Sequence, residues 1–272
     1  MNSKIADAIA LTNHPVALIW ADAAPEGATS FKPGRWACVM SLFAAAAAKA
    51  RVAAFDRQTY GCWGGGTGLG FGDCYKTFPG GEECFCSFLA DGNEGSEKGR
   101  KTGEMVASWG NRQMTDDFLK GERYLKDAAT TRAWLDVFPF RDIPAKWVVI
   151  KPLEQVDPAQ DEVKSVTFFV DPDRLSALVI LANYDQPAQE NVTIPWGAGC
   201  QSIGSFAYRE LEREHPRGVV GLTDISARNT VRPVLGKNAM SFTAPWPVFL
   251  RMEKNVEDSF LQRESWHEIM EH

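Results

Sequence analysis

Residues 60–72 read YGCWGGGTGLGFG, and the rest of the fold has to be built around this stretch. Seven of these thirteen residues are glycine. Each glycine loses more backbone entropy on folding than any other residue, so this density is unfavourable inside a helix or a strand. Glycine is usually retained where the backbone adopts positive φ or approaches a ligand closely. We therefore predict a non-helical glycine-rich loop, and the interleaved Cys62, Trp63 and Phe71 argue against a solvated linker.

Cysteine is concentrated in the same region. The chain has six cysteines, of which five lie within residues 38–86: Cys38, Cys62, Cys74, Cys84, Cys86 and, far along the chain, Cys200. The N-terminal residues lack the features of a secretory signal, and the longest apolar run, 42–48, is far shorter than the roughly 20 residues of a membrane span. We expect a cytoplasmic protein. There, clustered cysteines are more often metal ligands or catalytic groups than disulfides, although any one of them can be an inert buried side chain.

Composition excludes several classes of protein without indicating an activity. The 272 residues carry 29 Lys and Arg against 35 Asp and Glu, a net charge of −6, and 44% are hydrophobic. These values exclude a disordered or collagen-like chain. The acidic balance argues against nucleic acid and anionic membranes as partners. The partners that we expect are a small-molecule ligand or a redox partner. Self-association as a homo-oligomer is left open.

Hydrophobic patterning predicts an α+β or mixed α/β fold, a single globular unit with a central mixed sheet flanked by helices. Strands are predicted at 16–20, 52–55, 146–150, 166–170, 191–195, 219–222 and 240–243, and helices at 38–51, 105–138, 172–184 and 200–214. We expect one domain over 1–272, in which the cysteine- and glycine-rich segment 36–88 and the C-terminal half 146–254 share one core. Two local expectations complete the pattern: an extended Cys84-Phe85-Cys86 and an exposed loop over 91–103.

Three cysteines from distant parts of the chain share one local setting. Cys38 and Cys200 begin predicted helices, and Cys62 lies in the glycine stretch, so backbone N–H groups and helix dipoles can stabilise each thiolate. Each has a tryptophan nearby in sequence, namely Trp36, Trp63 or Trp196. Thiolates in a dry, N–H-rich, aromatic-walled pocket suit an iron–sulfur cluster. Taken singly, each tryptophan is better explained by core packing.

Other signatures are absent from the sequence. The stretch 66–70 does not satisfy the dinucleotide-binding fingerprint, there is no phosphate loop, and the histidines have no metal-binding spacing. The cysteines match neither ferredoxin run. Two rivals stay open. One is a non-redox module in which the glycine backbone binds a small molecule or an anion and the cysteines are structural or sense oxidants. The other is a thiol enzyme, for which no histidine lies close to a cysteine in sequence.

Four short motifs, in their order and separation, resemble the domain of unknown function 169 family. They are His14-Pro15-Val16-Ala17, Trp36-Ala37-Cys38-Val39-Met40, the glycine stretch 60–72, and Gly199-Cys200-Gln201-Ser202-Ile203-Gly204. The resemblance runs along most of the chain, to about residue 254. It brings no established activity and leaves the catalytic residues unknown.

What the resemblance implies is iron–sulfur binding by the cysteines that match it. Cys38, Cys62 and Cys200 are the expected ligands of a four-iron cluster, with Cys84 or Cys86 as the candidate fourth metal ligand. The backbone at Gly64, Gly65 and Gly66 would donate hydrogen bonds to the cofactor or its substrate. The part of Cys74 is left open. If only three cysteines bind, one iron lacks a cysteine ligand and can take a small molecule, as in an iron–sulfur oxidoreductase.

Overall fold

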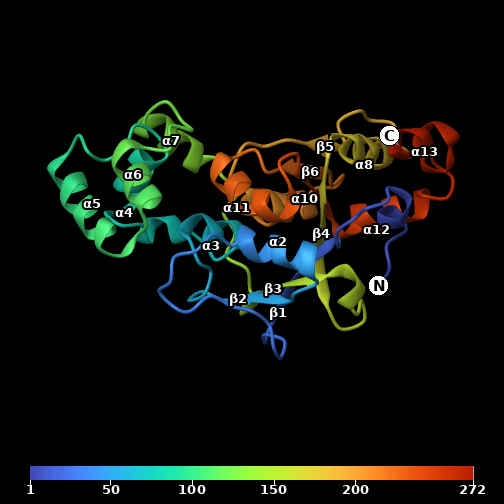
Figure 1. Ribbon diagram of the computed structural model, residues 1–272, viewed down its shortest axis with the longest axis horizontal. Coiled ribbons are helices and arrows are strands. Elements are labelled where there is room, and N and C mark those ends of the chain that lie inside the picture. Colours follow the sequence, from blue (N-terminus) through green and yellow to red (C-terminus); the bar gives the residue numbers. More distant parts are fainter. Residues whose placement is uncertain (272) are drawn as a thin grey trace. The chain divides into compact units, whose positions relative to one another are not determined.

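One mixed β-sheet organises the larger part of the chain, and the computed structural model describes residues 1–271 (Figure 1). Its strands are β1 (Val16–Ala21), β2 (Ala53–Phe55), β3 (Trp147–Pro152), β4 (Glu162–Val170), β5 (Val192–Thr193), β6 (Gly218–Gly221) and β7 (Met240–Pro245). They are ordered β2-β3-β1-β4-β7-β6-β5, antiparallel throughout except for the parallel pair β5–β6. The predicted α+β class with a central mixed sheet is confirmed.

The chain divides into two compact units. The first holds Met1–Phe71 and the chain from Arg141 onward, and the second is Gly72–Phe140. The first unit contains the sheet and α1 (Lys4–Ala8), α2 (Met40–Lys49), α3 (Trp63–Leu69), α8 (Pro172–Asn183), α9 (Gly199–Ile203), α10 (Ser205–Leu211), α11 (Ile225–Leu235), α12 (Trp246–Asn255) and α13 (Glu264–Glu271). Its short 3₁₀ turns are Leu153–Gln155 and Phe260–Gln262. Segment 36–71 therefore lies in the unit that contains 146–254, whereas 72–88 lies in the other.

One face of the sheet carries the main hydrophobic core. Alternate residues such as Ile19, Phe168 and Phe242 point to this face, where they pack with α1, α8 and α12. Phe168 and Phe249 of α12 have ring centroids 6.2 Å apart. The helices cover this face because each has an apolar stripe that is buried by packing against the apolar side of the sheet.

On the opposite face of the sheet, small hydroxyl side chains lie on the two central strands β4 and β7. Thr167 and Thr243, paired across β4 and β7, are fully buried with their Oγ1 atoms 3.0 Å apart. Ser165 donates to the carbonyl of Ile203 at the end of α9, and Trp20 packs edge-on against Tyr208 of α10. Small side chains let α9 and α10 approach the strands closely. This is the face that positions the cysteines.

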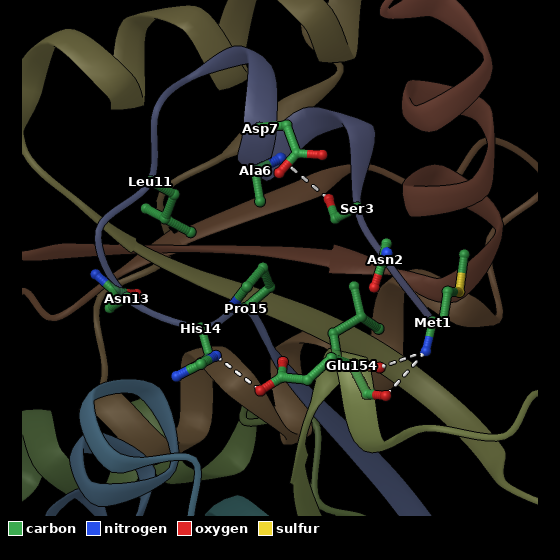
Figure 2. A pocket seen from close by; sticks show the side chains of 11 residues that line it. Met1, Asn2, Ser3, Ala6, Asp7, Leu11, Asn13, His14, Pro15 and Glu154 are labelled. Atoms are coloured by element: carbon green, nitrogen blue, oxygen red, sulfur yellow. Dashed lines mark hydrogen bonds and ion pairs between the residues drawn. The ribbon is translucent and has the colours of Figure 1, made fainter.

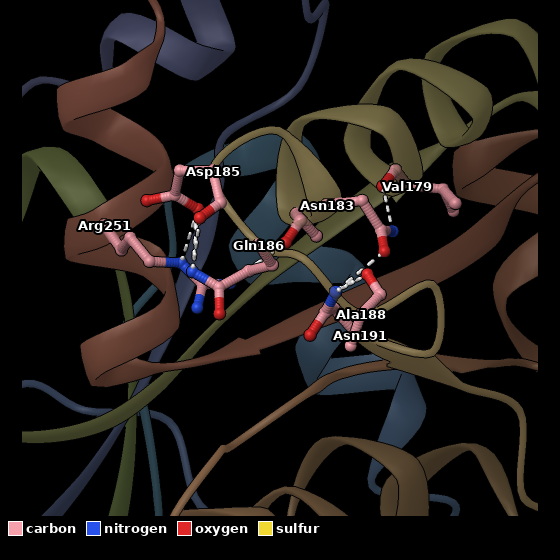
Figure 3. A network of polar contacts seen from close by, with 8 residues as sticks. Val179, Asn183, Asp185, Gln186, Ala188, Asn191 and Arg251 are labelled. Carbon is pink, nitrogen blue, oxygen red and sulfur yellow. Dashed lines mark hydrogen bonds and ion pairs between the residues drawn. The ribbon is translucent and has the colours of Figure 1, made fainter.

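A polar network fixes the connection that leads from α8 towards the cysteine-bearing α9 (Figure 3). Arg251 of α12 donates to the carbonyl of Ala182 and lies 3.4 Å from Asp185. Asn191, which is buried, donates to the side chain of Asn183 at 2.9 Å and to the carbonyl of Ala188 at 2.7 Å. The chain therefore enters β5 along a defined path.

The glycine stretch is where the sequence prediction is wrong. Residues Trp63–Leu69 form the helix α3, with Cys62 as its N-cap and Gly70 ending it at φ +96°. Propensity disfavours this helix, but close packing requires it. A Cβ at Gly68 would lie 2.9 Å from the sulfur of Cys200, and one at Gly204 would lie 2.0 Å from the carbonyl oxygen of Gly68. The glycines allow two helices to pack at near backbone contact.

The second unit is helical, as expected for 105–138, but it starts earlier than predicted. It comprises Cys74–Thr77, a 3₁₀ turn, α4 (Gly81–Phe88), α5 (Glu97–Trp109), α6 (Arg112–Lys120) and α7 (Ala128–Asp136). The expected loop over 91–103 ends at Ser96, whose side chain caps α5. Cys84-Phe85-Cys86 is helical, not extended, so the two thiols leave different sides of α4. Aromatic packing, with the rings of Phe78 and Phe118 stacked 5.8 Å apart, forms this unit's core.

Candidate metal centre

The three cysteines at distant positions in the sequence lie together in the first unit, at the N-terminal ends of α2, α3 and α9. Cys38 directly precedes Val39, the N-cap of α2. Cys62 is itself the N-cap of α3, and Cys200 is the second residue of α9. The elements that carry the three cysteines are linked by packing, since α9 packs against α3 and α11 packs against both α2 and α9.

Cys38 is held beside Cys62 by contacts on both of its sides. A Cβ at Gly61, which has φ +78°, would lie 2.4 Å from the carbonyl oxygen of Ala37. A Cβ at Gly65 would lie 2.8 Å from the side chain of Val39. The two neighbours of Cys38 in the chain, Ala37 and Val39, therefore pack against residues on either side of Cys62. Only glycine leaves room for this approach.

Cys62 and Cys200 bind the two ends of a single peptide group. The N–H of Gly65 donates to the sulfur of Cys62 at 3.2 Å, while the thiol of Cys200 donates to the carbonyl of Gly64 at 3.3 Å. The oxygen and nitrogen of one peptide group are about 2.3 Å apart. Adding the three lengths, 3.3, 2.3 and 3.2 Å, places the two sulfurs within about 9 Å of each other.

Electrostatics connect all three thiols. Cys200 is 3% exposed. Burial raises its thiol pKa well above the ordinary value, and negative charge on Cys62 and on Cys38 raises this pKa further. Each of these two cysteines is therefore close enough to act on Cys200 through space. Cys200 is therefore a protonated thiol, consistent with its donation to the carbonyl of Gly64.

A buried carboxyl group that the sequence reading missed acts on Cys200. Asp224 is 5% exposed and caps α11 by accepting the N–H of Ala227 at 2.9 Å. Burial raises the pKa of this carboxyl, whereas the N–H groups of Ala227 and Gly199 lower it in part. Its charge also raises the pKa of Cys200. The run Thr223-Asp224-Ile225 stands before an apolar helical pattern, and this is the sequence signature of an N-cap at Asp224.

The remaining cysteines belong to the second unit. Cys84 and Cys86 are buried there, and burial raises the pKa of both thiols. The carbonyl of Cys84 accepts from the buried Asn93 at 3.0 Å. Cys74, partly exposed, begins the 3₁₀ turn of this unit. A role for Cys84 or Cys86 as fourth ligand stays a prediction.

The donor chemistry of the first-unit cysteines fits an iron–sulfur cluster. Three thiols lie at or next to helix N-termini, where backbone N–H groups favour negative charge. Thiolates are the ligands that iron–sulfur clusters use. Within residues 1–271, no three His, Cys, Asp or Glu side chains are grouped closely enough to hold a single metal ion. A cluster of several irons is wider than one ion and draws its thiolates from farther apart. The tryptophans Trp36, Trp63 and Trp196 are each partly exposed.

A cavity of about 400 Å³ is formed elsewhere in the first unit, beside α1 and the loop before β1 (Figure 2). On one wall His14 Nδ1 lies 2.7 Å from a carboxylate oxygen of Glu154. The terminal ammonium of Met1 donates to the carbonyls of Leu153, Glu154 and Val156. His14 is therefore half-exposed and lies in contact with the Glu154 carboxylate. None of the six cysteines lines this cavity.

Comparison with known proteins defines the family. The family model for domain of unknown function 169, described as uncharacterised ArCR, matches residues 4–255. The chain belongs to this family, as its motifs indicated. No curated protein and no solved structure matches the chain. In the part of the chain that the structure describes, no helix combines the length and apolar character needed to cross a membrane.

Proposed function

We propose that this protein binds a four-iron iron–sulfur cluster through Cys38, Cys62 and Cys200 and uses it for redox chemistry or for activation of a small molecule. One observation carries the proposal. Three thiols from separate segments meet at the starts of three packed helices, and two of them act electrostatically on the buried third. The proposal sets the protein in the cytoplasm, where reducing conditions keep thiols available as ligands.

The backbone around the thiols favours an anionic group. The N–H of Gly65 already donates to the sulfur of Cys62, which satisfies a thiolate better than a thiol. Cys38, Cys62 and Cys200 each lie at or next to the start of a helix, where the positive end of the helix dipole favours negative charge. A cluster with thiolate ligands carries net negative charge, so these helix starts stabilise it and tune its potential.

Cluster binding requires a change at Cys200. Its thiol must lose a proton and release the carbonyl of Gly64, because only the thiolate is a metal ligand. Burial opposes this ionisation in the absence of iron, since the pKa of Cys200 is raised. Ligand binding by Cys200 is therefore expected to be the step that couples proton release to loading of the site.

The surrounding contacts exclude water from the inner side of the site. Ser205 of α10 is fully buried and donates to the carbonyl of Thr67 at 2.8 Å, and Tyr208 donates to that of Leu69 at 3.1 Å. Gly64, by contrast, has open space where a Cβ would point. We infer that α3 is anchored on its inner side and that a small molecule reaches the site from the side of Gly64.

When bound, a cluster held by three cysteines supplies one-electron transfer and an iron atom with an open coordination position. That position would accept a small-molecule ligand, or a thiolate of Cys84 or Cys86. The chain's own contribution is to hold the ligands, donate hydrogen bonds and exclude water. The N–H of Gly66 is bonded within the helix to the carbonyl of Cys62, so this group is available neither to the cofactor nor to the anion of the rival binding module.

The experiment is anaerobic purification followed by iron and acid-labile sulfide analysis with a visible absorption spectrum. Stoichiometric iron and sulfide are expected in the wild type, with loss in Cys38→Ser, Cys62→Ser and Cys200→Ser. Cys74→Ser, in the second unit and partly exposed, is the matched control and should retain the cluster. Cys84→Ser and Cys86→Ser report on the fourth ligand. A folded, colourless, iron-poor wild type after anaerobic reconstitution would refute the proposal and favour the non-redox binding module.

A further inference from the structure

Asp224 lies between β6 and α11, and it is not one of the proposed metal ligands. It follows Leu222, a buried residue in the left-handed region at φ +61°. That conformation is unfavourable for a non-glycine residue and persists only where the surrounding structure enforces it. The turn follows directly after the end of β6, and the side chain of Leu222 lies against the start of α9.

The first residue of α9 lies directly against this turn. A Cβ at Gly199 would lie 2.9 Å from the Cβ of Ala227 and 3.0 Å from the side chain of Leu222. One oxygen of Asp224, Oδ2, accepts the N–H of Ala227 in α11, and the N–H of Gly199 also acts on the carboxylate. A single side chain thus interacts with the first turns of two helices, and the next residue after Gly199 is the proposed ligand Cys200.

The second oxygen of Asp224 has no ordinary partner. Among the described residues no hydrogen bond reaches Oδ1, although Asp224 is only 5% exposed. A helix N-cap uses only one oxygen, and a neutral Asn or Ser would serve that role equally well. A buried carboxylate with an unused oxygen is costly unless it has a further task. Its charge acts on Cys200 from within the site.

We propose that Asp224 is a positioning residue of the metal centre: it holds the start of α9, and with it Cys200, and its negative charge lowers the reduction potential of the bound cluster. The inference rests on the proposed function. Reduction adds negative charge to a cluster, so a buried carboxylate nearby disfavours the reduced state. Removing the charge while keeping the cap is therefore predicted to shift the midpoint potential to a more positive value.

Asp224→Asn separates charge from structure, because Asn is as good an N-cap as Asp. Asp224→Ala removes both contributions. Asp171→Asn is the matched control, since Asp171 caps α8, on the other face of the sheet, by accepting the N–H of Arg174. The measurement is a potentiometric titration of the loaded protein, with iron and sulfide content determined for every variant.

We expect Asp224→Asn to keep wild-type iron content and to titrate at a more positive midpoint, with Asp171→Asn unchanged. Asp224→Ala should also lose iron. An Asp224→Asn midpoint equal to wild type, or an equal shift in Asp171→Asn, would overturn the inference. Should Asp224→Asn fail to fold, Asp224→Glu retains the charge and is expected to titrate close to wild type, and a large positive shift would count against the proposal.

A second readout does not need the cluster. If no variant, including the wild type, holds iron, the proposed function fails, and amide hydrogen exchange at Gly199 in the cluster-free protein then decides the positioning role. Faster exchange in Asp224→Ala than in wild type, with Asp224→Asn intermediate or unchanged, supports it. Equal exchange in wild type and Asp224→Ala refutes it.

Discussion

Gly68 is the residue at which helix packing and thiol chemistry are most directly linked. The absence of its side chain allows the sulfur and backbone of Cys200 to approach α3, with contacts of 2.9 to 3.0 Å to a hypothetical Cβ. Four positions earlier on the same helix, Gly64 faces open space. The two glycines are chemically identical but experience opposite environments.

This contrast gives a matched pair of substitutions. Gly68→Ala overpacks the α3–α9 contact and is expected to destabilise the protein by about 1–3 kcal/mol and to reduce iron content. Gly64→Ala should raise stability by roughly 0.5–1 kcal/mol through helix propensity and keep the cluster. Denaturant unfolding and iron analysis of both variants are the measurements. Equal effects of the two substitutions would contradict the packing described for α3.

Glu210 is a single residue from which the loss of protein stability at acid pH can be predicted. Its side chain is fully buried; burial would raise its pKa, but the hydrogen bond to Arg217 and the charges of Arg217, Arg213 and Arg209 lower it overall. A carboxyl with a depressed folded pKa stabilises the protein above its unfolded pKa, about 4.3, and this contribution is lost as pH falls from there through the folded pKa. Glu210→Gln should cost about 3 kcal/mol at pH 7.

The pH dependence provides the check on Glu210. Between neutral pH and the acid range below about 4.3, wild-type stability should fall more steeply than that of Glu210→Gln, so the two curves converge. Urea unfolding at a series of pH values measures this. Parallel curves would mean that Glu210 titrates in the folded protein as it does in the unfolded chain.

At the scale of elements, α3 and α10 are joined through backbone carbonyls that need a donor. Ser205 satisfies the carbonyl of Thr67 at 2.8 Å and lies 3.3 Å from that of Gly68. Ser205→Ala leaves buried acceptors without this donor and is expected to cost about 1–3 kcal/mol. Thermal unfolding should show the loss, and Ser205→Thr, which retains a hydroxyl, should not recover it fully because the site is closely packed. An unchanged melting temperature in Ser205→Ala would contradict the packing.

The elements also show what the sequence could and could not reveal. The strands at 16–20 and 166–170 and the helix at 172–184 have strong hydrophobic periodicity or a clear cap, and the structure contains all three. The glycine stretch was mispredicted because local propensity argued against a helix that tertiary packing stabilises. The prediction of an extended Cys84-Phe85-Cys86 is wrong because a three-residue pattern cannot distinguish a strand from a buried helix.

At the scale of the whole molecule, the sequence grouped three cysteines by their local setting but did not indicate where they lie. Cys38, Cys62 and Cys200 were linked by their local setting, and the long-range pairing that joins them passes through the sheet order β1-β4-β7-β6. Asp224 could not be assigned to the site beforehand, because its place depends on the strained turn at Leu222 and the contact of α11 with α9. Pairings of this kind are fixed by packing and leave no periodic trace.

The most direct measurement is a crystal structure of anaerobically purified protein with diffraction recorded at the iron absorption edge. The account predicts an anomalous peak of several irons bounded by the sulfurs of Cys38, Cys62 and Cys200, with Cys200 no longer bonded to the carbonyl of Gly64. Three ordered thiols around a site without anomalous signal in iron-replete crystals, or iron bound only to cysteines of the second unit, would contradict it.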